Sequence, residues 1–97
     1  MFVATVHHYC KTGLVESAAE RIDRNGLKMA ELDGFMYRYR MTCTDDDHKI
    51  TTITTWKDQA AYQGWLAARK TLAKEGPAPY DKVVTELYIV EQTLRKS

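Results

Sequence analysis

The stretch FMYRYRMTCTDDDHKITTITTW, residues 35–56, decides the fold. Residues 35–42 alternate aromatic or apolar side chains with other types, and this period of two predicts a strand with two different faces. Residues 44–48 are polar and predict a loop. Residues 49–56 are rich in threonine and isoleucine and predict a second strand, so the whole stretch is typical of an antiparallel hairpin.

The register of this hairpin decides which side chains share a surface, because a shift of one residue moves every side chain to the other face. We place the centre of the turn at Asp46. One surface then carries two pairs and the opposite surface carries two others: Tyr37 with Thr55 and Tyr39 with Ile53, and Arg38 with Thr54 and Arg40 with Thr52.

The rest of the chain adds two helices and two strands. Residues 2–9 predict a first strand and residues 83–91 a last one. Between residue 14 and Asp33 apolar side chains recur at helical spacing, with Gly26 predicting a bend or a close packing contact. Asp58 is a good cap for a second helix, which we expect to end at residues 76–77, Gly-Pro.

This order of elements predicts an α+β fold of the ferredoxin-like split βαβ type (βαββαβ), in which both helices cover one face of a four-stranded antiparallel sheet. The other sheet face would carry too many apolar side chains for water. A second copy stacked on that face would cover it, so we expect a homodimer. We expect residues 1–97 to form a single domain.

Composition excludes several classes of function. The formal net charge is only +1, which argues against a partner that is a nucleic acid. No signal segment or long apolar run is visible, so we expect a cytoplasmic protein with no membrane partner. Glycine-rich phosphate loops and the Gly-x-Ser-x-Gly and His-Glu-x-x-His motifs are absent, which leaves nucleotide binding, acyl transfer and zinc peptidase chemistry without support.

The segment TWKDQAAYQGWL at residues 55–66 resembles the Trp-x-x-x-x-Ala-aromatic-x-x-Trp segment of the antibiotic biosynthesis monooxygenase family, whose members are dimeric α+β barrels. Residues 33–35, Asp-Gly-Phe, are similar to the family's Gly-Phe before the second strand. Residues 11–13, Lys-Thr-Gly, are similar to its turn after the first strand. The resemblance covers roughly residues 2–91 in the order and length of the elements.

The resemblance implies a pocket between the helices and the sheet. Some family members oxygenate aromatic polyketides without metal or flavin, and others bind and degrade haem. Trp65 matches the second Trp, which lies in the haem pocket of the haem-degrading members. Their haem-ligating histidine falls at Glu75 here, and their pocket asparagine falls near Val6 or His7, so the resemblance makes haem degradation the less favoured activity.

We therefore predict a cofactor-independent monooxygenase for a small aromatic molecule of quinone type, with no cofactor and no metal. The predicted catalytic residues are His7 or His8 as a general base, only one of which can face the pocket, and Trp65 as a stacking surface. Side chains that could bind an aromatic substrate and stabilise charge on its oxygen complete the predicted site: Tyr37, Tyr39, Trp56, Tyr62, Arg38 and Arg69.

Two alternatives remain open from the sequence. The same fold could serve as a non-catalytic dimeric domain that binds a small ligand, because a fold does not fix an activity. Each candidate side chain could also be structural, since tryptophans and tyrosines more often pack than bind. His48 beside three aspartates lacks the alternating ligand spacing of a calcium loop, and we expect a solvated turn there.

Overall fold

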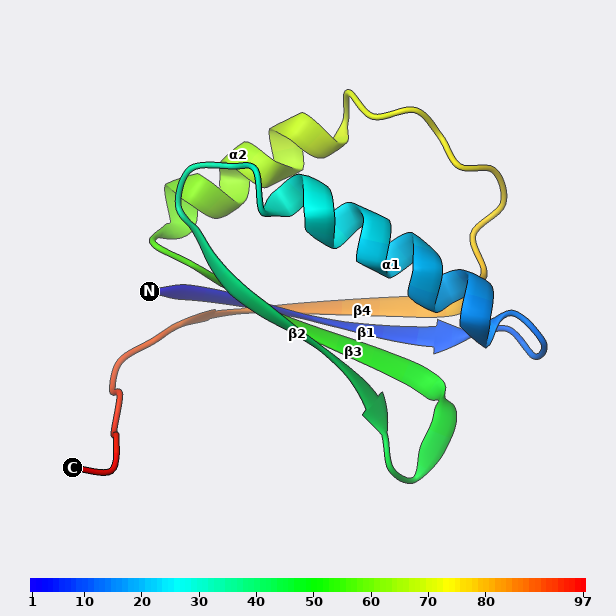
Figure 1. The fold of residues 1–97 in the computed structure, drawn as a ribbon, viewed down its shortest axis with the longest axis horizontal. Helices are drawn as coiled ribbons and strands as arrows, with labels where there is room; N and C mark the ends of the chain where they lie inside the picture. Colours follow the sequence, from blue (N-terminus) through cyan, green and yellow to red (C-terminus); the bar gives the residue numbers. More distant parts are fainter.

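The computed structural model describes all residues 1–97 and contains one four-stranded sheet with two helices. All neighbouring strands are antiparallel, in the order β2-β3-β1-β4, and both helices lie on one face of the sheet (Figure 1). The predicted split βαβ fold is confirmed. The elements are β1 (Phe2–Cys10), α1 (Val15–Met29), β2 (Phe35–Cys43), β3 (Asp46–Trp56), α2 (Gln59–Arg69) and β4 (Tyr80–Ile89).

The register of the β2–β3 hairpin is the predicted one, with Arg38 opposite Thr54 over the regular part of the ladder. The turn differs from the expectation. An irregularity after Thr42 lets Cys43 pair with Asp46, so β3 begins three residues before the predicted start and the predicted polar loop shrinks to a tight turn. This irregularity accommodates the change of register between the regular part of the ladder and the tight turn.

Gly26 lies inside α1, which continues through it to Met29. A Cβ atom at this position would overlap the guanidinium of Arg38, whose Nη1 donates a hydrogen bond to the carbonyl oxygen of Ile22 at 3.0 Å. The predicted close packing contact is therefore confirmed. Glycine is needed here because the arginine of β2 lies directly on the helix backbone.

The second helix begins as predicted, because the Asp58 side chain accepts a hydrogen bond from the backbone N–H of Ala61 at 2.9 Å. It ends at Arg69, well before the predicted stop at Gly76. The backbone tightens to three-residue hydrogen bonds after the helix, and the Thr71 hydroxyl bonds the carbonyl of Ala68 at 2.7 Å. A long connection then leads to β4, which starts at Tyr80 and not at residue 83.

The helix-facing side of the sheet holds two separate buried clusters. One is formed by Cys10, Ala18, Ile22 and Ile50. The other is formed by Phe2, Trp56 and Trp65. Between them the central strands present small side chains, Ala4, Thr52 and Thr54. Because these side chains are short, the helices and the sheet do not close on each other in the middle of the layer.

The opposite side of the sheet has no covering layer in the monomer (Figure 1). Several large apolar and aromatic side chains on this side are exposed, including Tyr39 at 60% and Tyr88 at 48%. Neither α1 nor α2 has the length and the hydropathy that a bilayer-spanning helix needs.

Gly34 provides a direct test of the packing between the β2 start and α2. Its φ is +86°, and a Cβ there would lie 2.5 Å from the Cβ of Ala61. Gly34→Ala should lower the free energy of unfolding by about 1–2 kcal/mol from the backbone alone, with the overlap adding to the loss. Gly64→Ala is the matched control, because Gly64 lies inside α2 with open space around it and should gain up to about 1 kcal/mol. Urea unfolding measures both. Equal effects of the two substitutions would contradict this account.

Candidate functional site

A cavity of about 270 Å³ lies between the two helices and the sheet, in the gap between the two buried clusters. Small-molecule sites usually measure about 300–1,000 Å³, so this one suits a small ligand. Every helix and every strand contributes to its wall. The lining side chains are Ala4, Val6, His8, Arg21, Ile22, Asn25, Met29, Arg38, Thr52, Thr54, Trp56, Tyr62, Trp65, Arg69, Ala78, Tyr80, Val83 and Thr85.

His8 is the histidine that lines the cavity. Its Nδ1 lies 3.1 Å from the carbonyl oxygen of Ile50, and because a carbonyl only accepts, Nδ1 carries the proton and Nε2 holds the free lone pair. No protein group bonds to Nε2. Burial lowers the pKa of His8 below 6.5, against the opposing effect of the bond to Ile50 and with a smaller contribution from the charge of Arg38. His8 is therefore neutral near pH 7 and has the form of a general base.

An aromatic wall closes one end of the cavity. Trp65 of α2 is 4% exposed and Trp56 of β3 is fully buried. Tyr62 packs on both Phe2 and Trp56, with ring centroids 5.3 and 6.4 Å apart. The Trp56 Nε1 is shielded from solvent and has no hydrogen-bond partner in the protein. This wall is suited to a flat ligand.

Two predicted arginines also line the cavity, Arg38 from β2 and Arg69 from the last turn of α2. Beside three threonines, the sequence interpretation missed three larger polar side chains of the lining: Arg21 and Asn25 of α1 and Tyr80 at the start of β4. Arg21 and Asn25 are four residues apart and so share a helix face, which is the signal that could have found them. The Tyr80 ring lies 4.9 Å from the His8 ring, centroid to centroid.

Three predicted site residues do not line the cavity. His7 lies on the opposite sheet face, where its ring nitrogens contact Thr51 at 2.9 Å and Glu86 at 3.0 Å. Tyr37 and Tyr39 lie on that face too, edge to face at 5.6 Å. The alternation of strand side chains separates all three from His8 and Arg38.

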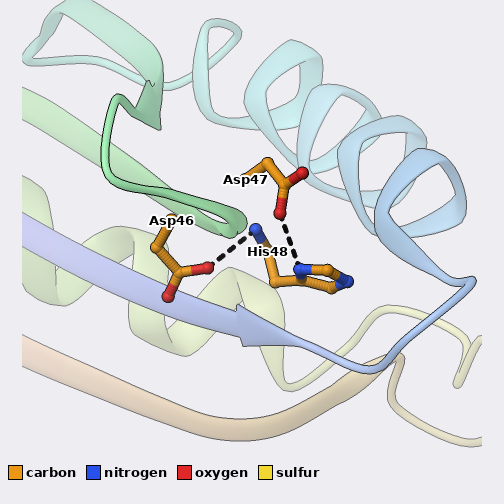
Figure 2. Close-up of side chains that lie close together, drawn as sticks. All are labelled: Asp46, Asp47 and His48. Atoms are coloured by element: carbon orange, nitrogen blue, oxygen red, sulfur yellow. Dashed lines mark hydrogen bonds and ion pairs between the residues drawn. The ribbon is translucent and has the colours of Figure 1, made fainter.

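The residues Asp46, Asp47 and His48 lie close together at the hairpin turn (Figure 2). The His48 backbone N–H donates to Asp46 at 2.9 Å, and the His48 Nδ1 lies 2.8 Å from Asp47. Both aspartates are exposed, and none of the three residues lines the cavity. The contacts are those of an acidic turn that bonds within itself.

Glu75 occupies the position that the resemblance assigns to a haem-ligating histidine, and it lies in the connection between α2 and β4. Its carboxylate is held by Arg21 and by Arg24, each at 2.9 Å. Hydrogen bonding by Arg24 is the main cause that lowers the pKa of Glu75, so the side chain stays ionised. Through these two ion pairs, Glu75 holds the connection between α2 and β4 against α1.

Comparison with known proteins agrees with this geometry. The sequence model of the family described as antibiotic biosynthesis monooxygenase matches residues 1–73. The chain belongs to this family. No curated protein matches the chain. The part of the chain that matches the antibiotic biosynthesis monooxygenase family includes His8, Arg38, Trp65 and Arg69 but ends before Tyr80.

Solved structures share the fold of this antibiotic biosynthesis monooxygenase family member. SnoaB, a cofactor-independent oxygenase from Streptomyces nogalater, is 20% identical with a TM-score of 0.71, over 98% of each chain. MhuD, a heme-degrader from Mycobacterium tuberculosis, is 13% identical with a TM-score of 0.77, over 98% of this chain and 100% of its own. A putative antibiotic biosynthesis monooxygenase from Nitrosomonas europaea is 18% identical with a TM-score of 0.73, over 95% of this chain and 100% of its own. At these identities the likeness is one of fold.

Proposed function

We propose that the protein is a cofactor-independent monooxygenase that acts on a small planar phenol, quinol or anthrone. The observation that carries the proposal is His8, a neutral histidine with an unbonded Nε2 in the wall of a cavity with an aromatic end. A base of this kind removes a proton from a phenolic or benzylic position. The resulting anion is electron-rich, and an electron-rich aromatic anion can react with O₂ directly.

The reaction balances without an external reductant. In an anthrone, or in the keto form of a phenol or quinol, His8 takes one proton from the reacting CH₂ group and leaves a carbanion, which gives an electron to O₂. The radical pair combines to form a C–O bond, and the peroxide takes the proton back from His8. Loss of water then leaves a carbonyl group. One oxygen atom enters the product, the other leaves as water, and the substrate supplies the electrons.

Side chains around His8 support the same activity. The faces of Trp65 and Tyr62 could hold a flat ring, and the Tyr80 ring lies tilted beside the imidazole of His8. Arg38 could stabilise negative charge that develops on the substrate oxygen, because its side chain is only 12% exposed and a partly desolvated charge acts strongly.

The deciding experiment is oxygen uptake with 1,8-dihydroxyanthrone, 1,4-naphthohydroquinone and haem, followed by mass spectrometry of products formed under ¹⁸O₂. We expect uptake with the anthrone or the quinol and one labelled oxygen atom in the product. Binding of these compounds without oxygen uptake would favour the non-catalytic ligand-binding domain. Uptake with haem alone would replace the proposed substrate class.

Trp65→Phe should weaken binding of 1,8-dihydroxyanthrone by about 3- to 10-fold while the fold is retained, since a smaller ring loses part of the stacking interaction. Ligand titration under nitrogen measures the affinity, and circular dichroism reports the fold. An unchanged affinity would show that the ring of Trp65 does not contact the ligand.

We also propose that the protein forms a homodimer through the sheet face opposite the helices. That face exposes Tyr37, Tyr39, Met41 and Tyr88 by 39–60% of their surface. Contiguous apolar patches of this kind usually mark an interface. His7 lies on this face, bonded to Thr51 and Glu86, which fits a role in assembly rather than in turnover.

A further inference from the structure

The charges around the cavity are unbalanced. Among its lining side chains are three arginines, Arg21, Arg38 and Arg69, and no aspartate or glutamate. The three come from α1, β2 and α2, three separate elements that converge on one space. A cavity that only stacked a neutral aromatic ring would not need three guanidinium groups at its wall, and the partial burial of two of them, Arg21 and Arg38, costs solvation.

Nearby carboxylates neutralise these arginines only in part. Asp23 lies 2.7 Å from Arg40, which does not line the cavity, and 3.9 Å from Arg38. Glu75 is likewise shared between Arg21 and Arg24. Each carboxylate therefore faces two guanidinium groups and leaves one positive charge in excess.

Arg69 has no ion-pair partner and lies at the last turn of α2. The arginines at and next to the cavity therefore carry more positive charge than the nearby carboxylates neutralise.

Arg38 shows that the arrangement is built into the fold. Its side chain is only 12% exposed and is held over α1 by the bond from Nη1 to the Ile22 carbonyl, in the space that Gly26 leaves open. Its Nη2 has no partner closer than the 3.9 Å contact to Asp23. A guanidinium that is fixed by one nitrogen and free at another is preorganised to receive a planar anion.

We propose that the substrate carries a carboxylate on its aromatic ring system. Arg38 binds this carboxylate, together with Arg21 or Arg69. The inference rests on the proposed function for the aromatic part of the ligand. Asn25, between Arg21 and Met29 on α1, adds a neutral amide donor in the same wall. The volume of about 270 Å³ favours a fused-ring acid of a few rings over a porphyrin acid.

The test compares the binding affinity of an aromatic acid with that of its uncharged methyl ester, in the absence of turnover. The probes are 1-hydroxy-2-naphthoic acid and its methyl ester, and binding is followed by tryptophan fluorescence and calorimetry. We expect the wild-type protein to bind the acid at least about tenfold more tightly than the ester, with a preference that shrinks as salt is raised. Arg38→Gln and Arg69→Gln should each reduce the preference, and the double variant should abolish it. The affinity for the ester should fall far less than the affinity for the acid, which shows that the cavity is intact.

Lys70→Gln is the matched control, because it removes one positive charge next to Arg69 at an exposed residue that does not line the cavity. It should keep the preference for the acid. Equal affinities of acid and ester in the wild-type protein, or binding of neither, would overturn the proposal. A parallel comparison of protoporphyrin IX with its dimethyl ester tests whether the carboxylates of a porphyrin are bound instead. If only the porphyrin were bound in a manner that required its free carboxylates, the proposal would also be overturned.

The outcome is independent of the oxygenase test. A preference for the acid without oxygen uptake by any quinol or anthrone would leave the carboxylate site standing and remove the proposed activity. Oxygen uptake with anthrones and no preference for the acid would do the reverse.

Discussion

Replacing His8 with glutamine should lower turnover of the anthrone or quinol by about 100-fold or more, because the base that removes the substrate proton is lost. Glutamine keeps a group that can donate to the Ile50 carbonyl, so the packing around position 8 is largely preserved. Steady-state kinetics should show the loss in kcat, with a much smaller change in KM. Turnover within a factor of about two of the wild type would remove His8 from the mechanism.

The pH profile of the wild-type protein gives a second readout for His8. In the proposed mechanism the neutral form of His8 is the active one. Burial lowers the pKa of His8, so this form persists to a lower pH than in an ordinary histidine. The acidic limb of kcat/KM should therefore have its midpoint below 6.5, and activity should be flat above it until another group titrates. In His8→Gln this limb should disappear. A limb that survived the substitution would belong to another group.

His7→Gln is the matched control, one residue along the same strand but on the other face. It removes the contacts to Thr51 and Glu86 and should leave kcat within about twofold of the wild type. Its effect should fall on the dissociation constant of the dimer, measured by sedimentation.

Tyr39→Lys should weaken the proposed homodimer by at least about 100-fold, since a twofold axis would place two lysine charges in the buried face. Tyr39 is 60% exposed in the monomer, so the substitution costs the fold of one chain little. Sedimentation velocity across a range of protein concentrations measures the shift from dimer to monomer.

Leu27→Lys provides the comparison for this variant. Leu27 is 72% exposed on α1, on the helix side of the molecule, and the same change there should leave assembly unchanged. A wild-type protein that stays monomeric at tens of micromolar, a concentration near which weak dimers dissociate, would overturn the dimer proposal.

The sequence alone predicted the arrangement of the elements and much of one wall of the cavity. Period-two alternation placed Arg38 and Thr54 on one face and Tyr37 and Thr55 on the other, because the pattern of a half-buried hairpin fixes its register. Helical spacing placed Trp65 and Tyr62 on the inner face of α2. The sequence could not show which of the two adjacent histidines faces the helices, because this depends on which face of β1 the helices cover.

The residues that the sequence missed depend on contacts between distant segments. Arg21 is a charged residue of α1, a type usually found on a solvated surface, but its long side chain reaches the cavity. Tyr80 precedes the predicted start of the last strand. The structure extends that strand because Lys11 donates a backbone hydrogen bond to Pro79 at 2.9 Å and Cys10 pairs with Tyr80, which no local pattern records.

The division of the core into two clusters has a consequence for how such a protein can diversify. The clusters around Ile50 and around Trp56 hold the helices to the sheet, whereas Ala4, Thr52 and Thr54 only border the space between them. A change in the size of these three side chains alters the shape of the cavity and removes no anchoring contact. Descendants of one ancestor can therefore exchange one ligand for another by substitutions at these positions while the frame stays constant. The strip between the clusters is where a library of variants aimed at a new substrate should concentrate.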